Sequence, residues 1–117
     1  MEIAVRNTSA GANAPILVLR GFPSGHFEST DETGASADLV ELAAKGVQYR
    51  ARQVNDKSWV TEWRIPFASL GIAPAKHPKV QFNISVRKTA DNQWVEWQGT
   101  GGNTWKVENA GVLEFAK

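Results

Sequence analysis

The stretch Val80–Lys88 reads Val-Gln-Phe-Asn-Ile-Ser-Val-Arg-Lys, and it decides the fold. Phe82, Ile84 and Val86 recur at every second position, so they point to one face of an extended strand while polar residues point to the other. A strand of this kind belongs to an antiparallel sheet that packs one face on a core. We therefore expect a central strand at Val80–Lys88.

Similar alternation recurs along the chain on both sides of this stretch. It predicts further strands at Glu2–Arg6, Pro15–Arg20, Val47–Val54, Trp59–Ile65, Asn92–Gln98 and Val112–Phe115. The first two of these are expected to form a hairpin, and the third and fourth an antiparallel pair turned by Asn55–Ser58. About seven short strands with almost no helix predict an all-β fold, an antiparallel, jelly-roll-like β-sandwich that forms one domain over residues 1–117.

Three segments between the strands carry other signals. Phe22–Ala35 is rich in Pro, Gly, Ser and Thr, which predicts a long, mobile surface loop, with Phe27 able to fix it to the core. Ser36–Lys45 has apolar residues at helical spacing and is the one expected helix, with Gly46 as its C-cap; a strand edge is the alternative. Gly99–Asn103 is expected to be a flexible loop.

The composition excludes several classes of function. The chain has 117 residues, no cysteine and a formal net charge of +1. Without cysteine there is no disulfide framework, thiolate nucleophile or cysteine-ligated zinc. The basic residues are scattered, so no nucleic-acid footprint is expected. The longest apolar stretches have the length of strands, and no membrane-spanning segment is expected.

Several blocks in the second half of the chain carry a resemblance. Trp59–Ile72 reads Trp-Val-Thr-Glu-Trp-Arg-Ile-Pro-Phe-Ala-Ser-Leu-Gly-Ile, in which an aromatic-led strand ends at Ile-Pro and a turn follows to Leu-Gly. Gln81–Arg87 contains a Phe-Asn strand, and Trp97 lies one hairpin later. Asn103–Trp105 is followed by the Gly-led strand within Ala110–Phe115. In order and spacing these blocks resemble carbohydrate-binding modules of the family 9 type.

The resemblance implies a sugar site. Sugar binding needs aromatic rings that stack on the apolar face of a pyranose and polar groups that bind its hydroxyls. Trp105 matches a stacking tryptophan of the family, Glu2 a carboxylate that accepts bonds from sugar hydroxyls, and Asn103 lies near a family asparagine. The position of the family's second stacking tryptophan precedes Met1.

Other predicted site residues come from the chemistry of their side chains. Hydrophobic Leu17 and Leu19 lie near positions where the family has polar residues, and Ser85 stands at the position of a family glutamine. The family's specificity for reducing-end glucose is therefore not carried over to this chain. Arg20, Arg87, Gln98 and Trp94 are candidates to rebuild the site, because guanidinium and amide groups are planar donors. By contrast, Trp59, Trp63 and Trp97 lie on alternating strands and are expected to pack in the core or on a sheet.

Catalysis and cofactors have little support in the sequence. No residue is assigned as catalytic, and the chain is predicted not to be an enzyme. A glycosidase would need two carboxylates that face each other across a cleft, and Glu62 with Glu96 is the one pair on neighbouring predicted strands. No cofactor and no metal site is assigned. Structural calcium is an open possibility, with Asp31, Glu32 and Asp91 as candidates that lack calcium-loop spacing.

The sequence thus predicts a non-catalytic module that binds a plant-type polysaccharide or oligosaccharide such as cellulose or xylan. The alternative is a structural or protein-interaction β-sandwich that has lost the sugar clamp. Family modules carry more strands before the one that begins at Glu2, so we expect either a fold truncated at the N-terminus or a reduced version of it. In both cases an exposed edge strand would favour a homodimer. The resemblance also implies an extracellular or periplasmic, bacterial protein.

Overall fold

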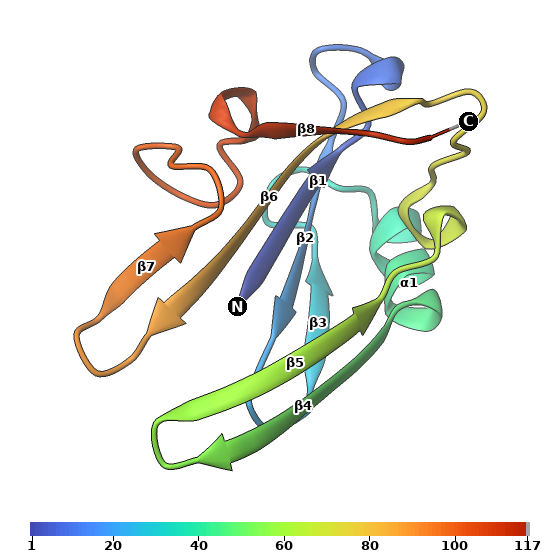
Figure 1. The fold of residues 1–117 in the computed structure, drawn as a ribbon. Helices are drawn as coiled ribbons and strands as arrows, with labels where there is room; N and C mark the ends of the chain where they lie inside the picture. Colours follow the sequence, from blue (N-terminus) through green and yellow to red (C-terminus); the bar gives the residue numbers. More distant parts are fainter. Residues whose placement is uncertain (117) are drawn as a thin grey trace.

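β6 (Lys79–Lys88) is the strand around which the larger sheet forms, as its alternation predicted (Figure 1). The computed structural model describes residues 1–116. The other strands are β1 (Glu2–Arg6), β2 (Ile16–Gly21), β3 (Phe27–Thr30), β4 (Gln48–Asn55), β5 (Ser58–Arg64), β7 (Gln93–Glu96) and β8 (Gly111–Glu114). They are joined by one helix, α1 (Ala37–Gly46), and by short 3₁₀ helices at Thr8–Ala10, Phe67–Leu70 and Val107–Asn109.

The larger sheet has the strand order β3-β2-β1-β6-β7, and β8 also pairs with β6. Every pairing in it is antiparallel. β7 pairs with the second half of β6, at Ser85–Lys88, and β8 pairs with the first half, at Lys79–Phe82. One long strand therefore holds three neighbours, which explains why it is the central strand that the sequence predicted.

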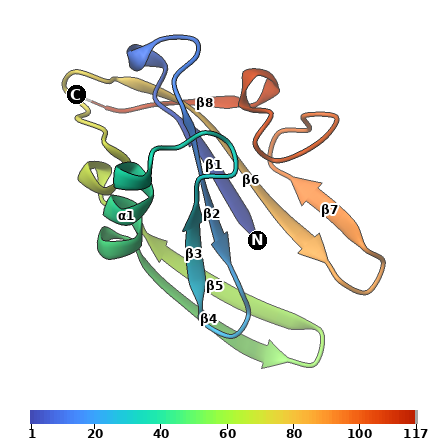
Figure 2. The same ribbon diagram turned by 180° about the vertical axis from the view of Figure 1, so that it is seen from behind.

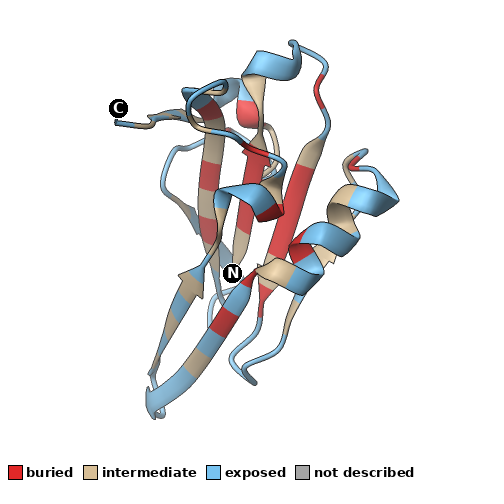
Figure 3. Ribbon diagram, turned by 90° about the vertical axis from the view of Figure 1, so that its right-hand side faces the viewer, coloured by how far each residue is buried: buried red, intermediate tan, exposed pale blue. Residues whose placement is uncertain are grey.

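The second layer consists of the β4–β5 hairpin together with α1. Figure 2, which views the molecule from behind, shows α1 beside β3 and the hairpin crossing the end of the larger sheet. The alternating residues of β1, β2 and β6 that face this layer form the core: Ile3, Val5, Leu17, Leu19 and Val80, each at most 5% exposed. Figure 3 shows that buried residues, in red, are concentrated in the strands of the larger sheet.

The predicted all-β fold is confirmed: antiparallel sheets in two layers give a sandwich-like architecture. The predicted pairing of the two strands turned by Asn55–Ser58 is also confirmed, with Tyr49 opposite Trp63. These two rings lie 4.4 Å apart between centroids and pack against the core. The hairpin thus turns its aromatic face inward and its charged face, with Arg50 opposite Glu62, outward.

The prediction of a long surface loop at Phe22–Ala35 was wrong in part. This segment is not a continuous loop, because β3 forms within it and pairs with β2. Phe27 packs edge-on against Trp63 at 5.8 Å, and Ser29 Oγ donates to the carbonyl of Val40 at 2.7 Å, so tertiary contacts fix this strand.

The predicted helix is confirmed, but its end differs. Ser36 caps the N-terminus of α1 and accepts a hydrogen bond from the backbone of Leu39 at 3.2 Å. Gly46 is the last helical residue and Val47 is the C-cap, in extended conformation. A Cβ at Gly46 would collide with the hydroxyl of Ser69, so the glycine is needed for close packing on the Phe67–Leu70 segment. Within residues 1–116, no helix is long and apolar enough to cross a membrane.

Candidate functional site

A row of polar side chains crosses the face of the larger sheet that points away from the β4–β5 hairpin. The strand register places one polar residue from each of five strands side by side, in the order Glu28, Arg20, Glu2, Ser85 and Glu96. Residues in register on neighbouring antiparallel strands point to the same face with Cβ atoms about 5 Å apart. The row is therefore a continuous polar strip perpendicular to the strands.

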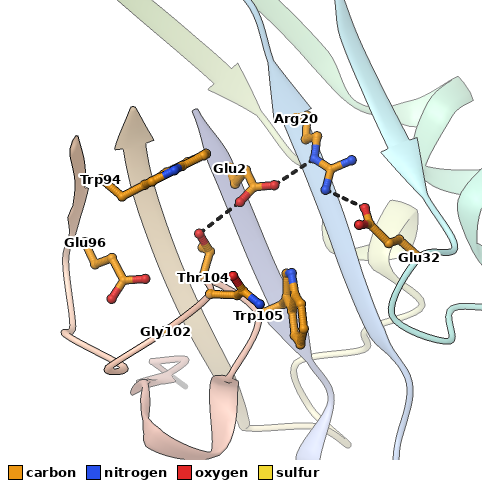
Figure 4. Close-up of a pocket in the computed structure, with 9 residues that line it drawn as sticks. Glu2, Arg20, Glu32, Trp94, Glu96, Gly102, Thr104 and Trp105 are labelled. Carbon is orange, nitrogen blue, oxygen red and sulfur yellow. Dashed lines mark hydrogen bonds and ion pairs between the residues drawn. The ribbon is translucent and has the colours of Figure 1, made fainter. Parts of the chain in front are cut away.

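The segment after β7 turns this strip into a pocket of about 280 Å³. Figure 4 shows side chains from β1, β2 and β7 meeting the loop that carries Thr104 and Trp105. The lining residues are Glu2, Arg20, Glu32, Trp94, Glu96, Gly102, Asn103, Thr104 and Trp105. Pockets that hold small ligands begin at about 300 Å³, so the size suits a small polar ligand unit.

Arg20 and Glu2 form the charged floor of the pocket. Arg20 Nε donates to Glu2 Oε2 at 2.7 Å, and Arg20 Nη2 donates to Glu32, while Glu28 lies 3.8 Å from the guanidinium. The hydrogen bond to Glu2 raises the pKa of Arg20, although burial acts in the opposite direction. Arg20 therefore stays cationic and is oriented by carboxylates on both sides.

The other oxygen of Glu2 connects the floor to the loop. Thr104 Oγ1 donates to Glu2 Oε1 at 3.0 Å, and the hydroxyls of Thr104 and Ser85 are hydrogen-bonded to each other. Thr104 is 2% exposed, so these bonds are shielded from water. Because Thr104 directly precedes Trp105, this chain of bonds fixes the backbone that carries the tryptophan.

Asn83, the asparagine of the predicted Phe-Asn strand, anchors both ends of the loop. It is 0% exposed, and its amide nitrogen donates to the carbonyls of Gln98 at 3.2 Å and Thr104 at 3.3 Å. Its amide oxygen accepts from the backbone of Gln98 at 3.2 Å and of Ile84 at 3.0 Å. One buried side chain on β6 thus clamps the start and the end of the loop that walls the pocket.

Glu96 and Thr100 order the middle of the same loop. Glu96 Oε2 accepts from the Thr100 amide at 2.9 Å, and the Thr100 hydroxyl donates to the carbonyl of Asn103 at 3.0 Å. The loop predicted to be flexible is therefore crossed by hydrogen bonds, and Asn103 is held at the pocket.

The two tryptophans of the pocket differ in how they are supported. Trp105 is half-buried, and it packs against a small cluster formed by Ala4 and Val18 of the sheet and Val107 of the last 3₁₀ helix. Trp94 on β7 is 49% exposed. Figure 4 shows the two rings on opposite sides of Glu2 and Thr104. The arrangement provides two apolar surfaces beside hydrogen-bonding groups, which is the combination that binds a sugar ring.

The structure brings together five of the residues predicted from the sequence, namely Glu2, Arg20, Trp94, Asn103 and Trp105. Arg87 is not in this pocket, since its guanidinium donates to Asn92 Oδ1 at 2.6 Å and 3.0 Å on the β6–β7 turn, where it lines a neighbouring groove. Gln98 lines neither cavity, and the hydrogen bonds it makes with Asn83 are from its backbone.

Some pocket residues were missed or were assigned another role. Glu96, Gly102 and Thr104 were not predicted to be in the sugar site, and Glu32 was considered only as a calcium ligand. The position of Glu96 two residues after Trp94 was an available signal, because residues two apart on a strand share a face. No sequence signal relates Glu32 to Arg20, since the two meet through tertiary packing.

The structure also bears on the carboxylates that were considered for catalysis and for calcium. Glu62 and Glu96 are not neighbours: Glu62 lies on the outer face of the β4–β5 hairpin and Glu96 on the larger sheet. In the part of the chain that the structure describes, no three His, Asp or Glu side chains gather as a metal site would require, and the candidates Asp31, Glu32 and Asp91 do not form a cluster.

Comparison of the chain with protein-family models, with curated proteins and with solved structures gave no match.

Proposed function

We propose that this protein is a non-catalytic carbohydrate-binding module whose site is the pocket between Trp94 and Trp105. The observation that carries the proposal is that one pocket joins Glu2, from the start of the chain, with Trp94, Asn103 and Trp105, from its last quarter. A neutral sugar offers apolar C–H faces to the rings and hydroxyls to the polar groups, and both kinds of partner are present here.

The polar floor supports the same proposal. The carboxylate of Glu2 and the guanidinium of Arg20 hold each other, so neither is an isolated charge that would have to be neutralised by an ionic ligand. A carboxylate has about four lone-pair positions and a guanidinium five N–H groups, so both keep capacity for sugar hydroxyls. The proposed ligand is a plant-type polysaccharide or oligosaccharide such as cellulose or xylan. On the resemblance alone, we also propose a secreted bacterial parent with an extracellular or periplasmic location.

The experiment is a calorimetric titration, supported by tryptophan fluorescence, with oligosaccharides of cellulose, xylan and chitin. Trp94→Ala and Trp105→Ala should each weaken binding by at least about tenfold, because aromatic anchors in a binding site cost about 2 kcal/mol or more when truncated. Trp97→Ala is the matched control: Trp97 is also 49% exposed, but it does not line the pocket. Circular dichroism of each variant confirms that it folds.

The result that would overturn the proposal is equal loss of binding in all three variants, or no binding of any glycan by the wild-type protein. The second outcome would favour a structural or protein-interaction domain.

One observation supports that alternative: Val95 and Trp97, on the face of the larger sheet that carries the core, are 52% and 49% exposed. This apolar surface beside β7, which pairs only with β6 among the described strands, would suit a homodimer, and light scattering at high protein concentration tests it.

A further inference from the structure

A second, larger groove adjoins the pocket. It has a volume of about 930 Å³ and lies between the turn of the β4–β5 hairpin, at Asn55–Ser58, and the turn of β6–β7, at Lys88–Asp91. The pocket and the groove share Glu2, Arg20 and Trp94. Because the same side chains line both, the pocket and the groove are adjacent. Pockets for small ligands extend to about 1,000 Å³, so the groove has room for more than the smaller pocket holds.

The groove continues the aromatic lining. Trp59 on β5 is half-buried and lies opposite Gln53 on β4, with both residues lining the groove. Phe22 is 39% exposed and is stacked on His26 with ring centroids 5.9 Å apart. Three rings, those of Phe22, Trp59 and the shared Trp94, therefore line the groove, together with neutral polar groups such as Gln53 and Thr89. Successive sugar units need both apolar platforms and hydrogen-bonding groups.

The charges of the groove are nearly balanced. Four cationic side chains, Arg20, Lys57, Arg87 and Lys88, line it together with three acidic ones, Glu2, Asp56 and Asp91. The excess is one positive charge, and a polyanionic chain would also meet three carboxylates, whose like charge opposes its binding. The balance favours a neutral chain.

We propose that the pocket and the groove form one extended cleft that binds several consecutive units of a neutral glycan chain, with Trp59 as the platform of the distal part. This inference rests on the proposed carbohydrate-binding function and adds to it the length and the charge of the ligand. It assigns a binding role to Trp59, whose alternating position in the sequence predicted packing. The affinity should therefore rise with the number of sugar units.

The test is a calorimetric series with cello- and xylo-oligosaccharides of two to six units, on the wild type, Trp59→Ala and Trp94→Ala. We expect the hexasaccharide to bind the wild type about tenfold more tightly than the disaccharide. In Trp59→Ala that gain should be lost while disaccharide binding is unchanged, whereas Trp94→Ala should weaken both. Val60→Ala is the matched control, since Val60 is the next residue of β5, is 49% exposed and does not line the groove; it should behave as wild type.

The other possible outcomes separately test the extended cleft, the neutral charge of the ligand, the occupant of the groove and the proposed function. Disaccharide binding that depends on Trp94, with no gain for longer chains or no effect of Trp59→Ala, overturns the extended cleft and leaves the proposed function standing. Tighter binding of hexagalacturonate than of the neutral hexasaccharides overturns the assignment of a neutral chain. A homodimer that Trp59→Ala dissociates would show that a second copy of the chain occupies the groove. Absence of binding to every glycan overturns the proposed function itself.

Discussion

Replacing Asn83 with alanine should destabilise the protein strongly, because this fully buried side chain joins β6 to both ends of the loop between Gln98 and Thr104, which walls the pocket. Its amide makes three hydrogen bonds to distant backbone groups: two to Gln98, and one to the carbonyl of Thr104. In Asn83→Ala these backbone groups lose their side-chain partner in a place that water reaches poorly. Three lost bonds at about 1 kcal/mol each, with an added penalty for groups left unpaired, give about 3–5 kcal/mol.

The assay is urea denaturation followed by tryptophan fluorescence. With a slope of about 2 kcal/mol per molar urea, the midpoint should fall by about 1.5–2.5 M. A domain near the middle of the usual range of about 5–15 kcal/mol would keep about 5 kcal/mol after this loss, so the variant should still fold in the absence of denaturant. Asn13→Ala is the control, because Asn13 is exposed in the turn before β2, and its midpoint should match the wild type within error.

A second substitution at the same position separates the contribution of the donors from that of packing. Asn83→Asp keeps the shape of the side chain but replaces the two N–H donors by an oxygen that faces two carbonyls, and it buries a charge. It should be at least as unstable as Asn83→Ala at neutral pH. A midpoint shift below about 0.5 M for Asn83→Ala, or wild-type stability of Asn83→Asp, would refute the reasoning.

Two further predictions concern the framework. Gly21→Ala should destabilise the protein by about 1–3 kcal/mol, since a Cβ there would lie 2.5 Å from the ring of Trp63; Gly99→Ala, with open space around the same atom, is the control, and equal midpoints in urea would contradict the packing argument. Ser36→Ala should cost about 1 kcal/mol through loss of the N-cap of α1, seen as a lower thermal midpoint. The exposed Ser9→Ala gives the reference, and an unchanged midpoint for Ser36→Ala would mean that the cap contributes nothing measurable.

The local elements followed from the sequence because their signals are short-range. Alternation at period two located β1, β5 and β6 to within one residue of their observed bounds, and it placed Phe82 and Ile84 on the core side. The helical spacing of apolar residues within Ser36–Lys45 located α1. β3 was missed because Phe27–Thr30 is short and polar, and it becomes a strand through its pairing with β2 and the contacts of Phe27 with the β4–β5 hairpin.

The sequence by itself determined the class of fold, the inward face of the central strand and the kinds of side chain that a sugar site would use. The tertiary structure decided which of those side chains meet. Trp94 and Trp97 are equally exposed, yet only Trp94 shares the face that carries Glu2 and Arg20, because the register of β7 on β6 fixes which residues face the strip. Alternation tells which residues share a face of one strand, but the alignment between strands depends on contacts distant in sequence, and the pocket exists only after that alignment is set.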